Sequence, residues 1–222
     1  MLNELSKKGI LLRSKRNYIF FGNQYFNPKR DLLSVKKTQY IHQVHGDHII
    51  AASDSLKKAD AHFTTDKSTA LVIKTADCMP VFISSSEKVM AIHIGWRGLK
   101  QKIFTKTISH FNKKKEAEIY IGPHIHYNSF QLDYDSAESL FKPHQLNIAT
   151  ALKLRVAKVS NTQTDHLYIC LKSLINLEFR QAGIKENQIF FDSVNTYTSP
   201  HHYSHRRCRQ RLGQNYSFII KN

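Results

Sequence analysis

The sequence predicts a mixed α and β protein of the α+β class, and three stretches of the chain carry this prediction. Residues 69–94 contain short apolar runs of strand length, separated by turn residues. Residues 90–111 change from a strand pattern to a helical pattern across a glycine turn. Residues 165–183 carry an amphipathic stripe of helical period. Strands and helices therefore alternate along the chain.

The first stretch, TALVIKTADCMPVFISSSEKVMAIHIGW, is expected to form two or three strands. Asp77, Pro80 and the serines at 84–86 are turn signals that bound these strands. Cys78 falls at the break between the first two apolar runs. It is therefore expected at a strand end, where functional side chains are commonly displayed, although a cysteine that packs as a small hydrophobe is the common alternative.

The second stretch joins a strand to a helix. Strand residues alternate between faces, so the apolar residues at 90, 92 and 94 share one face and His93 lies on the other. From about Gly98, apolar residues recur at helical spacing as far as Phe111. A glycine turn before a helix lets the backbone approach an anion, and Arg97 adds a planar cationic group there.

The third stretch is expected to be one amphipathic helix, with Asp165 as its N-cap and Gly183 as its stop. Cys170 falls on the apolar stripe of this helix and is expected in the core. Cys208 stands beside two arginines, an electropositive place that favours a reactive thiol.

Length and composition favour one domain over residues 1–222, because 222 residues can bury a sizeable core and no linker-like stretch divides them. The N-terminal apolar runs are too short for a signal peptide, and no run approaches the length of a membrane span. A cytoplasmic protein is therefore expected, without a membrane partner. Three widely spaced cysteines do not indicate a disulfide scaffold. The sequence does not fix the oligomeric state, and a homodimer is compatible with it.

The chain is strongly basic, with 33 Lys and Arg against 17 Asp and Glu and a formal net charge of +16. This charge is compatible with an anionic substrate or with nucleic acid. The basic residues are scattered, however, and no zinc-finger spacing or aromatic RNA-binding motif accompanies them. We therefore regard nucleic-acid binding as the weaker hypothesis.

Three soft or borderline donors, His45, Cys78 and His93, fall at separate predicted strand ends. Catalytic zinc takes three protein ligands and keeps a fourth position open, so this set is a candidate zinc site. The spacing does not by itself show that the three converge. The same residues also fit a mechanism without metal, in which Cys78 is a nucleophile whose thiolate is stabilised by a histidine.

Six motifs resemble, in order, those of the laccase-domain (YfiH-like) family, whose members were first called multicopper polyphenol oxidases and are now regarded as purine nucleoside phosphorylases. The resemblance covers most of the chain from about Tyr40 to Gly213. The motifs are Gln43-Val44-His45-Gly46, Ala59-Asp60, Ala76-Asp77-Cys78-Met79-Pro80, His93-Ile94-Gly95-Trp96-Arg97-Gly98, Gly122-Pro123-His124-Ile125 and Ser204-His205-Arg206-Arg207.

The resemblance implies a zinc site made by His45, Cys78 and His93, which would also be the catalytic residues. It implies phosphorolysis of adenosine, inosine and methylthioadenosine, with adenosine deamination as a further activity, so that purine nucleosides and phosphate are the expected partners. It also implies a fold with a central pair of mixed β-sheets flanked by helices, similar to that of bacterial cytotoxic necrotizing factors.

Supporting roles follow from the chemistry of the implied reaction. Phosphorolysis needs an anion pocket, for which Arg97, Arg206 and Arg207 are the candidates. Asp60 and Asp77 lie inside the motifs and would orient His45 or His93 from a second shell; turn-forming roles are the alternative. Cu²⁺ is expected to enter the same site in vitro, because it outcompetes zinc at most nitrogen and sulfur sites.

Two other activities stay open. A cysteine-dependent amidase acting on peptidoglycan precursors would use Cys78 and His93. A copper-dependent polyphenol oxidase is the other, but the 13 histidines, with pairs at 124/126 and 201/202, lack the paired motifs that several coppers require.

The chain departs from the family pattern in two regions. Asn195 stands where the family has a cysteine, and Leu212-Gly213-Gln214 replaces a Thr-Gly-Arg. The region around Phe21-Gly22 lacks the usual glycine-rich continuation.

Overall fold

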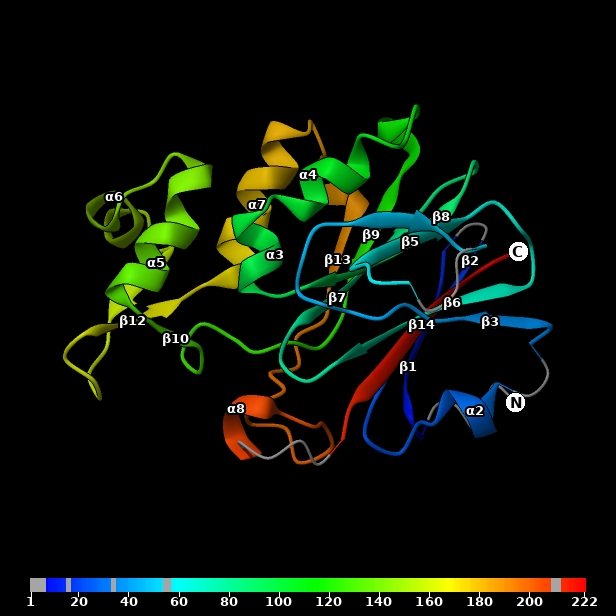
Figure 1. The fold of residues 1–222 in the computed structure, drawn as a ribbon, viewed down its shortest axis with the longest axis horizontal. Helices are drawn as coiled ribbons and strands as arrows, with labels where there is room; N and C mark the ends of the chain where they lie inside the picture. Colours follow the sequence, from blue (N-terminus) through cyan, green and yellow to red (C-terminus); the bar gives the residue numbers. More distant parts are fainter. Residues whose placement is uncertain (1–6, 15–16, 33–34, 54–56, 209–212) are drawn as a thin grey trace.

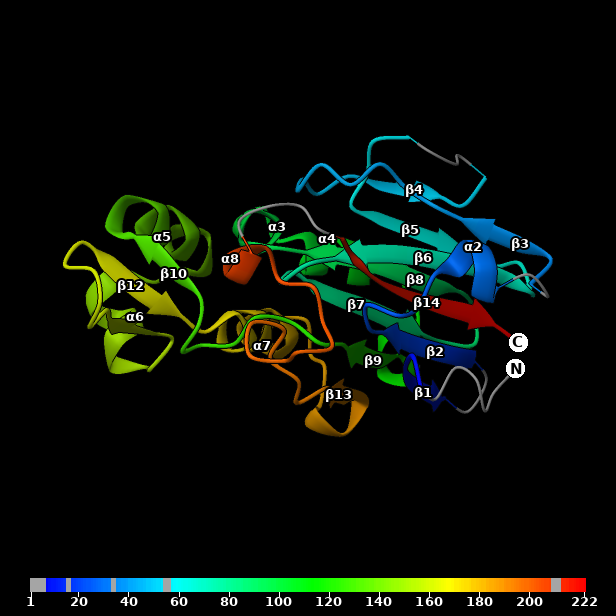
Figure 2. The same ribbon diagram turned by 90° about the horizontal axis from the view of Figure 1, so that it is seen from below.

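The computed structural model describes residues 7–14, 17–32, 35–53, 57–208 and 213–222, and Figure 1 shows their arrangement. Two large sheets face each other, and a lobe with a small third sheet projects to one side of them (Figures 1 and 2). Among the described residues, no helix combines the length and apolar character needed to cross a membrane.

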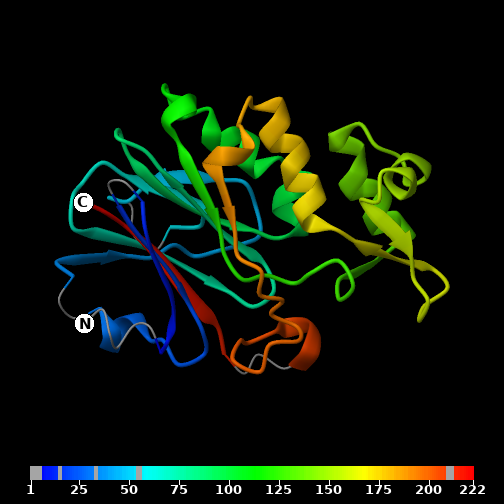
Figure 3. The ribbon, with the colours of Figure 1, turned by 180° about the vertical axis from the view of Figure 1, so that it is seen from behind.

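The first sheet has five strands and is mixed, because β3 runs parallel to β6 while its other pairs are antiparallel. Its strands, in spatial order, are β1 (Gly9–Arg13), β2 (Asn17–Gly22), β14 (Asn215–Lys221), β6 (Thr69–Thr75) and β3 (Lys37–Gln39). Figure 3 shows the C-terminal strand β14 running through this sheet.

The second sheet has six strands and is also mixed, with parallel pairs at both edges. Its order is β13 (Ile189–Phe191), β9 (Glu118–Ile121), β7 (Met79–Ser84), β8 (Val89–Ile94), β5 (Ala61–Thr64) and β4 (Ile49–Ala51). Phe21 and Leu71 of the first sheet pack with Phe82 and Ala91 of the second in one apolar cluster. The predicted pair of mixed sheets is therefore confirmed.

Helices cover the opposite face of the six-stranded sheet, where the even-numbered residues of β8 point. The alternation predicted for residues 90–94 is confirmed. Met90, Ile92 and Ile94 join the helix-side core, whereas Val89 and Ala91 join the core between the sheets. The covering helices are α3 (Trp96–Lys100), α4 (Ile103–Ile108) and α7 (Leu171–Gln181).

The lobe contains a three-stranded sheet that the sequence analysis does not predict. Its strands are β10 (Gln131–Asp133), β12 (His166–Ile169) and β11 (Ala157–Val159), and its helices are α5 (Tyr134–Phe141) and α6 (Ile148–Lys153). The remaining helices of the described residues are α2 (Pro28–Asp31), α8 (His205–Cys208) and 3₁₀ turns at Lys114–Glu116, Lys142–His144 and Glu186–Gln188.

Three local predictions are corrected. The helix expected from about Gly98 to Phe111 is two short helices, because Lys102 between them adopts a left-handed conformation with φ of 55°. The stretch after Asp165 begins as strand β12, so α7 starts at Leu171 and Asp165 is not its N-cap. Pro80 lies inside β7 rather than bounding it. The predicted stop at Gly183 is confirmed, since it follows the helix with φ of 74°.

Candidate metal centre

Strand pairing brings His45, Cys78 and His93 together. Because β7 and β8 are antiparallel and Met79 pairs with Ile94, the start of β7 meets the end of β8. Cys78 therefore lies beside the end of His93's strand, and His45 reaches the same place from the loop between β3 and β4. One ligand atom from each of the three lies within 4.8 Å of the others.

Gly95 makes this approach possible. A Cβ placed on Gly95 would lie 2.9 Å from Cys78 Sγ and 3.5 Å from His45 Cδ2, the first being shorter than real Cβ contacts. The glycine turn is evident in the sequence, but this contact is not. The close packing of backbone against thiol is visible only once β7 and β8 are paired.

We expect Gly95→Ala to lower the metal affinity of the site by about tenfold or more, because the new methyl group must displace the Cys78 thiol. Metal content after dialysis against a graded zinc buffer measures this change. Gly46→Ala is the matched control, since a Cβ there meets Asp60 Oδ2 at an ordinary 3.6 Å. Equal metal affinity of Gly95→Ala and wild type would contradict this account.

Asp60 lies fully buried beneath the three residues and accepts hydrogen bonds from two of the elements that carry them. His93 Nδ1 donates to Asp60 Oδ1 over 2.8 Å. The backbone N–H groups of Val44, His45 and Gly46 donate to the same carboxylate at 3.2, 3.0 and 2.7 Å. Asp60 thus fixes both the His93 ring and the loop that presents His45.

The His45 loop holds a strained backbone. His45 has φ of 62°, in the left-handed region that residues with a side chain seldom adopt. Its N–H is held by Asp60, and its carbonyl accepts from Gln101 Nε2 at 3.3 Å. Contacts on both sides of the residue therefore stabilise a conformation that would otherwise cost about 1–3 kcal/mol.

The close approach of the three side chains shifts the pKa values of Cys78 and His93. Burial alone would raise the pKa of the Cys78 thiol, but the adjacent His93 and His45 outweigh burial and lower it to about 6. Burial alone would lower the pKa of His93, but Cys78 and Asp60 outweigh it and raise it to about 9. Without a metal, their mutual interaction therefore favours the thiolate form of Cys78 and the protonated ring of His93.

The donor set suits a metal ion. The hydrogen bond from Nδ1 to Asp60 leaves Nε2 of His93 as the ring nitrogen free to bind a metal. His93 is buried, Cys78 is half-buried and His45 is exposed, so the cluster opens to solvent on the His45 side. Two histidines, one thiolate and an open side match the ligands that catalytic zinc uses.

Asp77 has a different place from the one expected. Its Oδ1 accepts from Thr196 Oγ1 and its Oδ2 from the Arg206 N–H, both at 2.7 Å. Both oxygens of the carboxylate are thus engaged by the C-terminal segment rather than by His45 or His93. Asp77, with φ of 88°, holds this segment beside the turn that presents Cys78, a contact in keeping with the alternative, turn-forming role.

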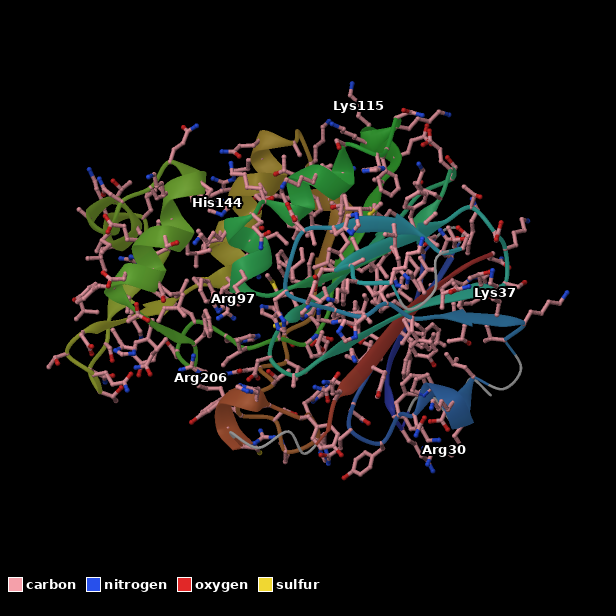
Figure 4. All side chains as sticks on the ribbon, viewed as in Figure 1. Arg30, Lys37, Arg97, Lys115, His144 and Arg206 are labelled. Carbon is pink, nitrogen blue, oxygen red and sulfur yellow. The ribbon has the colours of Figure 1, made fainter. Side chains whose placement is uncertain are left out.

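The three candidate arginines differ in what they contact. Arg97 stacks its guanidinium on the Trp96 ring at 4.5 Å, and Figure 4 labels it at α3. Arg206 donates to the Gln131 carbonyl over 2.8 Å and lies over the Phe130 ring, so it links α8 to the lobe. Arg207 donates to the backbone carbonyls of a turn, and its role in phosphate binding stays a prediction. The acceptors of Arg207 are Thr196, Tyr197, Ser199 and His202.

Other singled-out residues lie outside the cluster. Cys170 is the half-exposed N-cap of α7, which corrects the expectation that it is buried in the core. Cys208 is half-exposed at the end of α8. His124 is buried and donates to the Gly122 carbonyl. Asn195 accepts from the N–H of His126 and donates to Ser129 Oγ, so it joins two loops where the family has a cysteine. Of the other departure, Leu212 lies outside the described residues.

Solved structures share the fold of this chain. A Neisseria meningitidis protein superposes with a TM-score of 0.81 at 18% identity, covering 97% of this chain and 99% of that one. The YlmD protein of Geobacillus stearothermophilus superposes with a TM-score of 0.79 at 18% identity, covering 96% and 99% of the two chains.

Sequence relatives carry a functional name. A protein of Rickettsia conorii named purine nucleoside phosphorylase is 27% identical over 213 residues, covering 91% of this chain and 85% of its own. One of Shigella flexneri named purine nucleoside phosphorylase YfiH is 28% identical over 190 residues, covering 82% and 73%. The family model described as "Multi-copper polyphenol oxidoreductase laccase" matches residues 28–222. The chain therefore belongs to this laccase-domain family, which includes the YfiH proteins.

Proposed function

We propose that this protein is a zinc-dependent purine nucleoside phosphorylase acting on adenosine, inosine and methylthioadenosine. The convergence of His45, Cys78 and His93 above the buried Asp60 carries the proposal. The names of the family relatives support the reaction class. A bound zinc would supply a Lewis acid that stabilises negative charge developing during the reaction.

The chain's own residues have separate tasks in this proposal. His45, Cys78 and His93 hold the metal, and Asp60 positions His93 through its Nδ1 proton. A phosphate oxygen attacks the anomeric carbon of the sugar, the glycosidic carbon–nitrogen bond breaks, and the purine leaves with the bonding electrons and gains a proton. Arg97, whose guanidinium lies over the Trp96 ring, binds the phosphate, and Arg206 assists from α8.

Chromatography of nucleoside products tests the reaction. Zinc-loaded protein with adenosine and phosphate is expected to release adenine, and none without phosphate. Cys78→Ala is expected to lower the rate of adenine release by more than about 100-fold. This loss is larger than the roughly 10- to 100-fold that is typical when a residue supporting a metal ligand is changed. Cys170→Ala is the matched control, because this half-exposed cysteine lies outside the cluster. Inosine formed without phosphate would instead identify adenosine deamination, and intact purines would contradict both activities.

One observation favours a second candidate, a cysteine-dependent amidase acting on peptidoglycan precursors. The lowered pKa of Cys78 makes its metal-free thiolate a competent nucleophile beside His93. Iodoacetamide labelling separates the candidates. If Cys78 is a zinc ligand, it is protected from iodoacetamide until a chelator removes the metal, and the chelator also abolishes activity. If Cys78 is an amidase nucleophile, it reacts with iodoacetamide at once, and the enzyme stays active with chelator.

A further inference from the structure

A second candidate site lies on the outer face of the five-stranded sheet. Here α2 and Phe26 cover an apolar cluster that includes Val72 and Phe218 (Figure 1). Beside this cover is a cavity of about 510 Å³, a size that holds small ligands. Its lining residues come from α2, the loop after β3, β6 and β14, and do not include His45, Cys78 or His93.

The strand register builds the floor and one wall of this cavity. In the pairing of β14 with β6, Tyr216 lies opposite Lys74 and Phe218 lies opposite Val72. Directly paired residues project from the same face of a sheet, so Lys74 and Tyr216 stand together beside the buried Val72. Tyr40 packs against the same apolar cluster and lines the cavity with Tyr216. The ligand space therefore has two half-buried phenol rings and an apolar floor.

The loop that carries Tyr40 is fixed rather than loosely packed. Gln43 Nε2 donates to the Lys74 carbonyl at 2.7 Å, and the Lys74 N–H donates to Gln43 Oε1 at 3.0 Å. These paired hydrogen bonds attach the loop to the end of β6. The cavity is thus formed before a ligand arrives, which lowers the entropic cost of binding.

The charge of the lining selects the ligand. Lys29 and Lys74 line the cavity, and no acidic residue is among its described lining residues. Neither lysine takes part in an ion pair within the described part of the chain; the nearby Asp31 instead binds Lys8 and Arg30. Two uncompensated ammonium groups beside two aromatic rings complement a ligand that joins a planar ring to an anionic group.

We propose that this cavity binds a purine nucleoside monophosphate, with its phosphate between Lys29 and Lys74 and its base against Tyr40 and Tyr216. A phosphomonoester carries about two negative charges, which two lysines match. Stacking of a base on an aromatic side chain contributes about 1–3 kcal/mol. This proposal does not depend on the phosphorylase reaction proposed above.

Calorimetric titration with adenosine 5′-monophosphate tests the site. Lys29→Ala and Lys74→Ala are each expected to weaken binding by about fivefold or more. Lys37→Ala is the matched control, because this exposed lysine lies on the neighbouring strand β3 and does not line the cavity (Figure 4). Adenosine and inorganic phosphate, titrated separately, are expected to bind more weakly than the nucleotide.

The location is tested with Cys78→Ala and with a photoreactive azido-adenosine monophosphate. Nucleotide affinity is expected to be unchanged in Cys78→Ala, and the label is expected in peptides that contain Tyr40 or Tyr216. Binding that is lost in Cys78→Ala but kept in the lysine variants would place the nucleotide at the metal centre and overturn the proposal. The proposal would also be overturned if inorganic phosphate bound as tightly as the nucleotide, or if the nucleotide did not bind. Phosphorolysis by the Lys29→Ala variant is expected to persist, so the two proposals can fail separately.

Discussion

Asp60→Ala is expected to lower the metal affinity of the protein by about 10- to 100-fold and its free energy of unfolding by about 3 kcal/mol or more. The variant would leave the buried His93 Nδ1 and three backbone N–H groups without an acceptor. The left-handed conformation of His45 would also lose one of its two supports. Metal content and chemical denaturation measure the two losses.

Two further variants separate the role of Asp60 from a general loss of charge. Asp60→Asn is expected to lose most of the metal affinity that Asp60→Ala loses. The amide has one oxygen in place of two, so its NH₂ group must face N–H donors that it cannot accept from. Asp66→Ala is the control, since Asp66 is exposed and lies outside the cluster. Wild-type metal affinity in both Asp60 variants would show that Asp60 does not position the ligands.

Acid is expected to unfold the protein well above the pH at which its carboxyl groups titrate. Burial lowers the pKa of His62 to about 3 and that of His124 to about 4. In the unfolded chain both bind a proton near pH 6.5. Below that pH the unfolded state binds more protons than the folded state. The free energy of unfolding therefore decreases as the pH is lowered, until the pKa of the folded state is reached. Each histidine is expected to lower the free energy of unfolding by about 1.5 kcal/mol between pH 6.5 and 5.

His144 and His202 act in the same direction, because burial lowers the pKa of each to about 4. Urea unfolding at a series of pH values measures the slope. His62→Gln keeps a side-chain donor for the Val72 carbonyl but cannot titrate. In this variant, the slope of the free energy of unfolding against pH is expected to decrease by the equivalent of about one proton between pH 6 and 4. His110→Gln, which changes an exposed histidine, is the control. An unchanged slope in His62→Gln would contradict the prediction.

Local sequence patterns predicted those elements whose period is unambiguous. Residues 89–94 alternate between the two cores as expected, because a strand with both faces buried keeps a strict period of two. The stripe after Asp165 was ambiguous. Leu167 and Ile169 satisfy a strand in the three-stranded sheet, while Leu174 and Ile175 satisfy the helix, and the pairing of β12 with its neighbours decides where one ends.

For the site, the residue types at predicted strand ends indicated a metal centre, and the motifs pointed to the family. The contacts around the three donors came from elements distant in sequence. Asp60 reaches His93 across 33 residues and Asp77 reaches Arg206 across 129. No periodicity encodes such contacts, which is why the sequence does not show that Asp77 and Arg207 bond to the C-terminal segment.

The sequence by itself determined the α+β class, the family, the faces of the strand that ends in His93 and the three donors. These depend on side-chain period and on residue type, both of which are local. The tertiary structure decided that the donors lie within 4.8 Å, that Gly95 leaves room for the thiol, and that Asp60 serves ring and backbone together. It also decided where a cavity lined by two lysines opens on the five-stranded sheet. Distances between side chains depend on how the sheets pair and pack, and burial then sets their pKa values.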